Sequence, residues 1–169
     1  MWVTGLPSSG KSTLARGVAE RLRRLGVPVE VLESDELRRV LTPNPSYGEE
    51  ERRWFYGVLV YMAGLLARNG VNVIIDATGN RRAYRELARR RFEKFVEVYV
   101  RCPLEVCMRR DVKGLYRKAL EGAVKTLPGL QTPYEEPKNP EITVDTDRLS
   151  PEESVETVLD GLRRLGYLK

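Results

Sequence analysis

Residues 5–12 read Gly-Leu-Pro-Ser-Ser-Gly-Lys-Ser and fit the pattern Gly-x-x-x-x-Gly-Lys-Ser/Thr. The pattern follows a short apolar run at 1–4 and precedes apolar positions with helical spacing over 11–25, which is the context of a phosphate-binding loop. Glycines let backbone N–H groups point inward around phosphates, and the following helix adds the positive end of its dipole. We expect Lys11 to reach the β- and γ-phosphates of a nucleotide, and the Ser12 hydroxyl to be a ligand of Mg²⁺.

Apolar runs alternate with helical patterns along the rest of the chain, which predicts an α/β fold with a doubly wound parallel sheet. The expected strands span 1–4, 27–32, 71–75, 95–100 and 142–144, and the expected helices span 11–25, 34–41, 49–69, 81–92, 104–110 and 151–165. A length of 169 residues predicts a single domain over 1–169. The stretch 111–141, which contains four prolines, is expected to be irregular and to serve as a lid or binding segment.

The composition excludes several kinds of enzyme. The chain has no histidine, so it cannot be a Ser-His-Asp hydrolase, a Cys-His protease or a His-ligated zinc enzyme. Its two cysteines, Cys102 and Cys107, are too few for a disulfide framework and are expected to be reduced packing residues. No apolar run approaches the ~18–20 residues that span a bilayer, and no signal peptide precedes the first strand. We therefore expect a cytoplasmic protein with no membrane partner.

The formal net charge of +5 suits a nucleic acid, an anionic membrane or a small polyanionic substrate. Arginine clusters occur at 52–53, 81–82 and 89–91, but they lack the interleaved aromatic residues of a base-stacking surface. We interpret them as solvated helix faces, and nucleic acid is not an expected partner.

Two aspartates follow expected strands, at the edge of a parallel sheet where ligands bind. Asp35 could accept a proton from an acceptor hydroxyl or hold Mg²⁺ through water, and it could also cap the helix that follows. Asp76 ends the run Val73-Ile74-Ile75 and resembles a Walker B aspartate, which would make it a Mg²⁺ ligand. A structural role as a strand-end cap is an equally weighted alternative for Asp76.

Motifs in the second half resemble one family of phosphate-loop kinases. Residues 103–111 read Pro-Leu-Glu-Val-Cys-Met-Arg-Arg-Asp, residues 113–119 read Lys-Gly-Leu-Tyr-Arg-Lys-Ala, and Pro-Tyr-Glu at 133–135 precedes Asn-Pro-Glu at 139–141. This succession is similar to the lid of the adenylylsulfate kinases (APS kinases). It stands in register with the phosphate loop, so the resemblance covers nearly the whole chain.

The resemblance implies a P-loop three-layer sandwich with a five-stranded parallel sheet, and a homodimer. It implies that the γ-phosphoryl group of MgATP is transferred to the 3′-hydroxyl of adenosine 5′-phosphosulfate (APS). The products would be ADP and PAPS, the 3′-phosphorylated form of APS, which would place the chain in PAPS biosynthesis and sulfate assimilation. Residues 111–135 would be the lid.

The resemblance also assigns residues to the two substrates. Asp35 would be the general base or be linked to Mg²⁺, Arg38 and Arg52 would contact the acceptor, and Tyr47 would pack on its adenine. The acceptor site would comprise Asp35, Arg38, Tyr47, Arg52, Lys125 and Leu127. The ATP site would comprise Gly5, Leu6, Pro7, Ser8, Ser9, Gly10, Lys11, Ser12, Thr13, Arg110 and Lys113.

The acceptor site departs from the family pattern. An asparagine of the family is Phe55 here, and two paired arginines are Gly57 and Val58. The family's F-T-G-I-D segment reads Leu-Pro-Gly-Leu-Gln at 127–131, so one wall of its aromatic clamp is aliphatic, and the S-P-Y-R segment reads Gly-Asn-Arg-Arg at 79–82. Two alternative functions therefore stay open: a kinase for another small-molecule hydroxyl, and a regulatory or nucleic-acid-binding ATPase.

Overall fold

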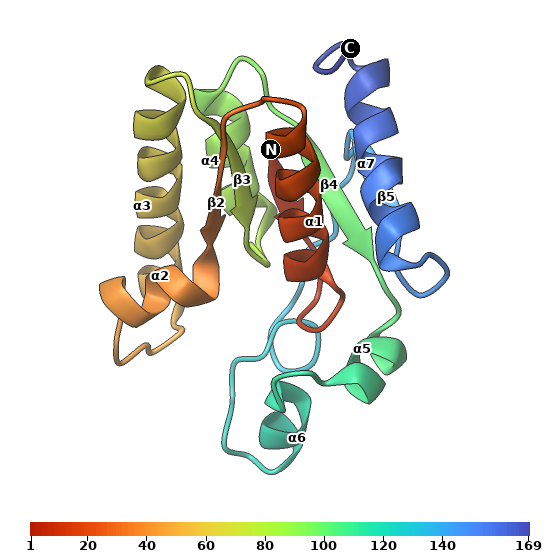
Figure 1. The fold of residues 1–169 in the computed structure, drawn as a ribbon. Coiled ribbons are helices and arrows are strands. Elements are labelled where there is room, and N and C mark those ends of the chain that lie inside the picture. The colour runs from red at the N-terminus through yellow and green to blue at the C-terminus, as the bar shows by residue number, and fades with distance from the viewer.

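The computed structural model describes residues 1–169 and contains a five-stranded parallel sheet in the order β2-β3-β1-β4-β5 (Figure 1). The strands are β1 (Trp2–Thr4), β2 (Val29–Glu33), β3 (Asn72–Asp76), β4 (Glu97–Arg101) and β5 (Ile142–Asp145). The helices are α1 (Lys11–Arg24), α2 (Ser34–Leu41), α3 (Glu49–Arg68), α4 (Arg82–Arg91), α5 (Leu104–Arg110), α6 (Leu115–Leu120) and α7 (Pro151–Arg164). The predicted α/β fold with a parallel sheet is confirmed, and the expected elements differ from these bounds by no more than two residues at either end.

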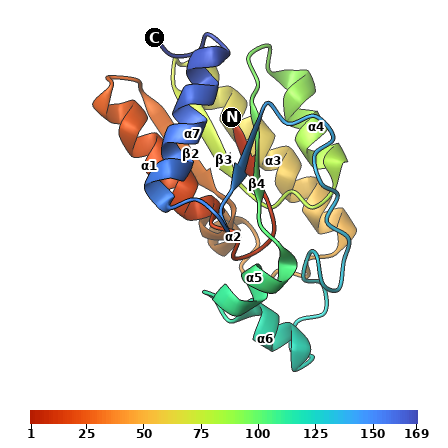
Figure 2. The ribbon, with the colours of Figure 1, turned by 90° about the vertical axis from the view of Figure 1, so that its right-hand side faces the viewer.

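Helices cover both faces of the sheet. α1 and α7 pack on one face, whereas α3 and α4 pack on the other (Figure 2). Successive strand residues point to opposite faces. Val3 and Ile74 accordingly pack in the apolar cluster beneath α1 and α7, whereas Trp2 and Ile75 pack in the cluster beneath α3 and α4. The central strands carry apolar residues toward both faces, as in Val3 and Trp2 of β1 and Ile74 and Ile75 of β3, because both faces of the sheet are buried there.

The expectation that 111–141 lacks secondary structure is wrong, since this stretch contains α6. Both carboxylate oxygens of Asp111 accept hydrogen bonds at the start of that helix, from the N–H groups of Tyr116 and Arg117 at 3.0 Å each. Tyr116 and Ala119 are buried in a third apolar cluster, with Cys102, Cys107 and Leu127. A helix of six residues is too short to give a periodic signal, but its two buried residues are enough to hold it against α5.

α5 and α6 extend beyond the carboxyl ends of the strands, on the side where β2 leads into α2 (Figure 1). None of the helices combines the length with the apolar character that crossing a bilayer requires.

Candidate active site

The phosphate loop connects β1 to α1 in a conformation that its glycines permit. Gly10 has a φ of +99°, in the region that favours glycine. At Gly5 an added Cβ would lie 2.5 Å from the carbonyl oxygen of Val100, so a side chain there would collide with β4. The Thr146 hydroxyl, just after β5, donates to the carbonyl of Ser9 at 2.6 Å. These contacts fix the loop at the carboxyl end of the central strands.

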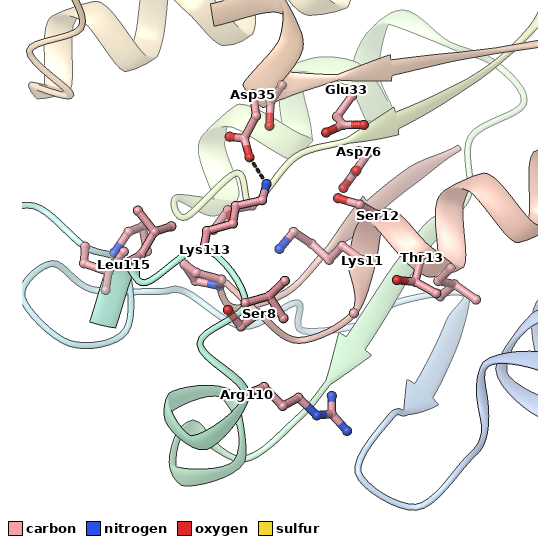
Figure 3. A pocket seen from close by; sticks show the side chains of 18 of the residues that line it. Ser8, Lys11, Ser12, Thr13, Glu33, Asp35, Asp76, Arg110, Lys113 and Leu115 are labelled. Carbon is pink, nitrogen blue, oxygen red and sulfur yellow. Dashed lines mark hydrogen bonds and ion pairs between the residues drawn. The ribbon is translucent and has the colours of Figure 1, made fainter. Parts of the chain in front are cut away.

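Beside this loop lies a cleft of about 510 Å³ at the carboxyl ends of the strands, where ligands bind in sheets of this kind. The start of α2, the start of α3 and the end of β3 form its walls. Arg110 and several residues between 112 and 128 line the side toward α5 and α6. Figure 3 shows Lys11, Ser12 and Asp76 close together on one side of this cleft, and Asp35 and Lys113 facing each other across it.

Lys11 lies between the loop and two aspartates. Its Nζ donates to the carbonyl of Leu6 at 2.9 Å. Burial lowers the pKa of Lys11, while the negative charges of Asp76 and Asp35 raise it. Lys113 forms an ion pair with Asp35. Two ammonium groups and two carboxylates therefore meet next to the phosphate loop.

Arg38 is held between two aromatic rings. Its guanidinium carbon lies 3.9 Å from the ring centroid of Phe55 and 4.9 Å from that of Tyr47. Glu51 accepts a hydrogen bond from Arg38 Nη1 at 2.9 Å and also accepts from the N–H of Ser46 at 2.6 Å. The Glu51 carboxylate thus fixes Arg38 and the loop before α3 together. Only 7% of Arg38 is exposed, and it lines the cleft.

Arg52 is a buried cation whose partners are all neutral oxygens. It donates to the carbonyl of Tyr47 at 2.8 Å, to Oδ1 of Asn80 at 2.9 Å and to the carbonyl of Thr126 at 2.8 Å. Burial lowers the pKa of Arg52, because charge in an apolar environment is unfavourable. A buried cation without a carboxylate partner favours an anionic ligand.

Most of the predicted site residues line this one cleft. Those that line it are Pro7, Ser8, Gly10, Lys11, Ser12, Thr13, Asp35, Arg38, Tyr47, Arg52, Asp76, Arg110, Lys113 and Leu127. Gly5, Leu6 and Ser9 do not line it, and Ser9 is fully buried within the loop. Lys125 is exposed and outside the lining, whereas its neighbours Val124 and Thr126 belong to it. Asp35 is not the helix N-cap, since α2 begins at Ser34 and Glu33 occupies that position.

Sequence reasoning missed Asn80, Thr126 and Thr146 as parts of the site. Asn80 and Thr126 contribute through contacts to Arg52, which no local pattern reveals. Thr146 directly follows the last strand. Because ligands bind at the carboxyl ends of strands in a parallel sheet, this position is the one signal that could have indicated Thr146 as a site residue.

The comparisons with known proteins identify the family. The sequence profile of the family described as adenylylsulphate kinase matches residues 1–145. The chain is 52% identical over 148 residues to a probable adenylyl-sulfate kinase of Archaeoglobus fulgidus, covering 88% of this chain and 96% of that protein. The chain belongs to the adenylylsulfate kinase family. It is an enzyme with adenylyl-sulfate kinase activity, an ATP-dependent phosphotransfer.

Further relatives of this kinase support the same family assignment. A probable adenylyl-sulfate kinase of Pyrococcus abyssi is 44% identical over 168 residues, covering 99% of this chain and 97% of that one. The solved structure of the Mycobacterium tuberculosis APS kinase CysC in complex with AMPPNP and APS aligns with a TM-score of 0.90 at 37% identity, over 96% and 95% of the two chains. A gluconokinase of Sinorhizobium meliloti aligns with a TM-score of 0.61 at 21% identity, which shows a shared fold alone.

Proposed function

We propose that the cleft transfers the γ-phosphoryl group of MgATP to the 3′-hydroxyl of APS, with the phosphate loop binding ATP and the Arg38 and Arg52 side binding APS. The observation that carries this proposal is the position of Asp35. Its carboxylate lines the same cleft as the phosphate loop and the two buried arginines. A carboxylate placed there can accept the proton of an attacking hydroxyl.

On the ATP side, backbone N–H groups of residues 6–13 and the ammonium group of Lys11 neutralise the phosphates. The contact of Lys11 Nζ with the Leu6 carbonyl is replaced by a contact with phosphate oxygen when ATP binds. Arg110, which donates to the carbonyl of Thr146 at 2.5 Å, borders the end of the cleft near α7. These residues supply positioning and charge, which are the main needs of phosphoryl transfer.

The residues beside Lys11 fit a magnesium ion. The Ser12 hydroxyl and the Asp76 carboxylate, which is 3% exposed, are hard oxygen donors that face the same space beside the phosphate loop (Figure 3). No group of three or more carboxylate, thiol or imidazole side chains is gathered as a metal site. That fits Mg²⁺, which commonly takes one or two protein ligands and completes its shell with water and substrate phosphates. When bound, Mg²⁺ neutralises charge on the β- and γ-phosphates.

On the acceptor side, Arg38 and Arg52 hold the anionic phosphosulfate, because guanidinium groups donate paired hydrogen bonds to such groups. Tyr47, which is 40% exposed and has a φ of +54°, offers its ring to the adenine, and the aliphatic Leu127 forms another wall. The Asp35 carboxylate separates from Lys113 and then accepts the proton of the 3′-hydroxyl. Its ion pair with Lys113 and its contact with the substrate therefore alternate.

The segment 111–135 acts as the lid that closes over the two nucleotides. Its helix α6 already contacts the phosphate loop, since the Tyr116 hydroxyl donates to the carbonyl of Pro7 at 2.9 Å. Exclusion of water by such a segment prevents loss of the phosphoryl group to hydrolysis.

A homodimer in the cytoplasm is the proposed form of the enzyme. The outer face of α3 carries Trp54, Tyr61 and Leu65, which are 51%, 56% and 39% exposed. An apolar row of this kind on one helix is typical of an interface, and two copies can pair through it around a two-fold axis. Light scattering of the wild type and of Tyr61→Glu tests this interface. We expect the mass of a dimer for the wild type and the mass of a monomer for Tyr61→Glu. The cytoplasmic location is proposed because the reaction uses ATP as the phosphoryl donor.

Release of ADP in the presence of MgATP tests the proposed reaction. We expect release that depends on APS, with PAPS identified by mass, and little release with gluconate or RNA in its place. Release that depends on another hydroxyl acceptor would favour a different small-molecule kinase, and release stimulated by RNA would favour a nucleic-acid-dependent ATPase.

A further inference from the structure

Arg52 and Asn80 join the segments that surround the acceptor side of the cleft. Arg52 Nη1 donates to Asn80 Oδ1 at 2.9 Å, and Arg52 Nη2 donates to the carbonyl of Thr126 at 2.8 Å. Asn80 Nδ2 in turn donates to the carbonyl of Pro133 at 3.1 Å. One guanidinium and one amide therefore bridge both ends of the loop 126–133.

We propose that Asn80 is a positioning residue that orients Arg52 toward the anionic group of APS and couples its binding to the loop 126–133. This inference rests on the role proposed above for Arg52. The asparagine itself is 4% exposed and does not line the cleft, so it acts through Arg52 rather than on the substrate.

The backbone around Asn80 is fixed on several sides. The N–H of Gly79 donates to the Tyr56 hydroxyl at 3.2 Å, and the N–H of Glu135 donates to the carbonyl of Asn80 at 2.7 Å. Gly79 has a φ of +51°, and an added Cβ would lie 2.8 Å from the Trp2 ring, so this turn requires glycine. A rigid turn gives the amide of Asn80 one position, which is the requirement for orienting another side chain.

An amide suits this position better than a carboxylate. It accepts from Arg52 and donates to Pro133 while leaving the positive charge of Arg52 uncompensated. The guanidinium has five N–H groups, of which three are used by Tyr47, Asn80 and Thr126. Two donors and the full charge are left for an anion. Because another donor of the same guanidinium holds the Thr126 carbonyl, an anion that fixes Arg52 through its two free donors also stabilises the loop.

Steady-state kinetics of Asn80→Ala test the orientation of Arg52. We expect the KM for APS to rise about tenfold, as for a lost hydrogen bond to a charged group, while the KM for ATP changes less than about twofold. Asn72→Ala is the matched control, because Asn72 Nδ2 also donates to a proline carbonyl, that of Pro28 at 3.1 Å, at the opposite end of the sheet. Asn80→Ser, whose shorter side chain cannot reach both partners, replaces the alanine variant if that variant does not fold.

A double-mutant cycle with Arg52→Gln separates this inference from the function on which it rests. We expect Asn80→Ala to have no further effect on the KM for APS in the Arg52→Gln background. An equal effect in both backgrounds, or no effect in the wild type, would overturn the role of Asn80. If Arg52→Gln itself leaves the KM for APS unchanged, then the proposed function of Arg52 fails instead.

Hydrogen exchange of residues 126–133 tests the coupling to the loop. We expect APS alone to slow exchange of these amides in the wild type and in Asn72→Ala, and to have no such effect in Asn80→Ala. Slowing of the same size in Asn80→Ala would show that the loop responds to APS without this amide, and would overturn the coupling.

Discussion

Lys113, in the connection between α5 and α6, forms an ion pair with Asp35 at the start of α2. The two residues are 78 positions apart in the sequence and face each other across the cleft (Figure 3). The pair joins the lid to the carboxylate that we propose as general base. The same ammonium group lies beside the phosphate loop, where we propose that the phosphates of ATP bind.

Replacing Lys113 by alanine is expected to affect activity far more than stability. Both side chains of the pair are about half exposed, and exposed ion pairs contribute little to folding. We therefore expect Lys113→Ala to shift the unfolding temperature by less than about 2 °C and to lower kcat/KM roughly tenfold. Lys118→Ala, which removes an exposed lysine of α6 with no ion pair, serves as the control for both measurements. Equal losses of kcat/KM in the two variants would contradict a specific role of Lys113.

Phe55→Leu is expected to weaken binding of APS through Arg38. The ring of Phe55 supports the guanidinium at 3.9 Å, and leucine keeps an apolar side chain there without that support. The loss of such a contact corresponds to a KM for APS raised about fivefold, with the KM for ATP unchanged. Phe95→Leu is a matched control, because Phe95 is buried and lies 4.9 Å below the guanidinium of Arg89, outside the cleft.

Both phenylalanine variants are expected to lose about 1–2 kcal/mol of unfolding free energy, since each replaces a buried ring by a smaller side chain. A raised KM for APS in both variants would attribute the effect to general destabilisation rather than to Arg38.

The phosphate loop and the alternation of strands and helices could be predicted because their signals are local. The Gly5–Ser12 pattern needs only consecutive residues, and the strands show as short, mostly apolar runs between helical patterns. The network around Arg52 could not be predicted, because Asn80 and Thr126 reach it from distant parts of the chain. The resemblance to the family implies Lys125 as a site residue, whereas the structure places its neighbour Thr126 in the lining of the cleft. An irregular segment has no periodicity that shows which side chain faces a cleft.

The contribution of Glu135 to stability is expected to depend on pH. The backbone N–H of Arg82 donates to its carboxylate at 2.7 Å and lowers the pKa of Glu135 below the ordinary value of 4.5, with a further contribution from Arg81. A lowered pKa in the folded state stabilises the fold above the unfolded-state pKa, and the contribution is lost as the pH falls through the folded-state value. Glu135→Gln should therefore be less stable than the wild type by about 1 kcal/mol at pH 7.

Chemical denaturation at several pH values measures this difference. We expect the gap between wild type and Glu135→Gln to narrow as the pH falls below 4.5, whereas Glu93→Gln, an exposed site without an ion pair, should show no gap at pH 7. A difference in unfolding free energy between wild type and Glu135→Gln that stays constant from pH 7 to strongly acidic pH would contradict a lowered pKa of Glu135 in the folded state.

Both cysteines are expected to be unreactive in the folded enzyme. Cys107 is fully buried and Cys102 is 7% exposed. Burial, together with the neighbouring Cys102 thiol, raises the pKa of Cys107 to about 12, so the reactive thiolate is scarce at pH 8. A disulfide reagent at pH 8 should modify neither thiol in the folded protein and both in denaturant. Rapid modification of the folded protein would contradict the packing of α5 against α6.

The effect of Asp35→Asn on turnover and on ATP binding tests the central claim most directly. Asparagine has nearly the same shape but cannot accept the proton of the 3′-hydroxyl. We predict that kcat for APS-dependent ADP release falls at least about 100-fold, while the Kd for ATP changes less than about threefold. A variant that keeps most of its turnover, or one that loses ATP affinity and turnover equally, would contradict the assignment of Asp35 as the general base.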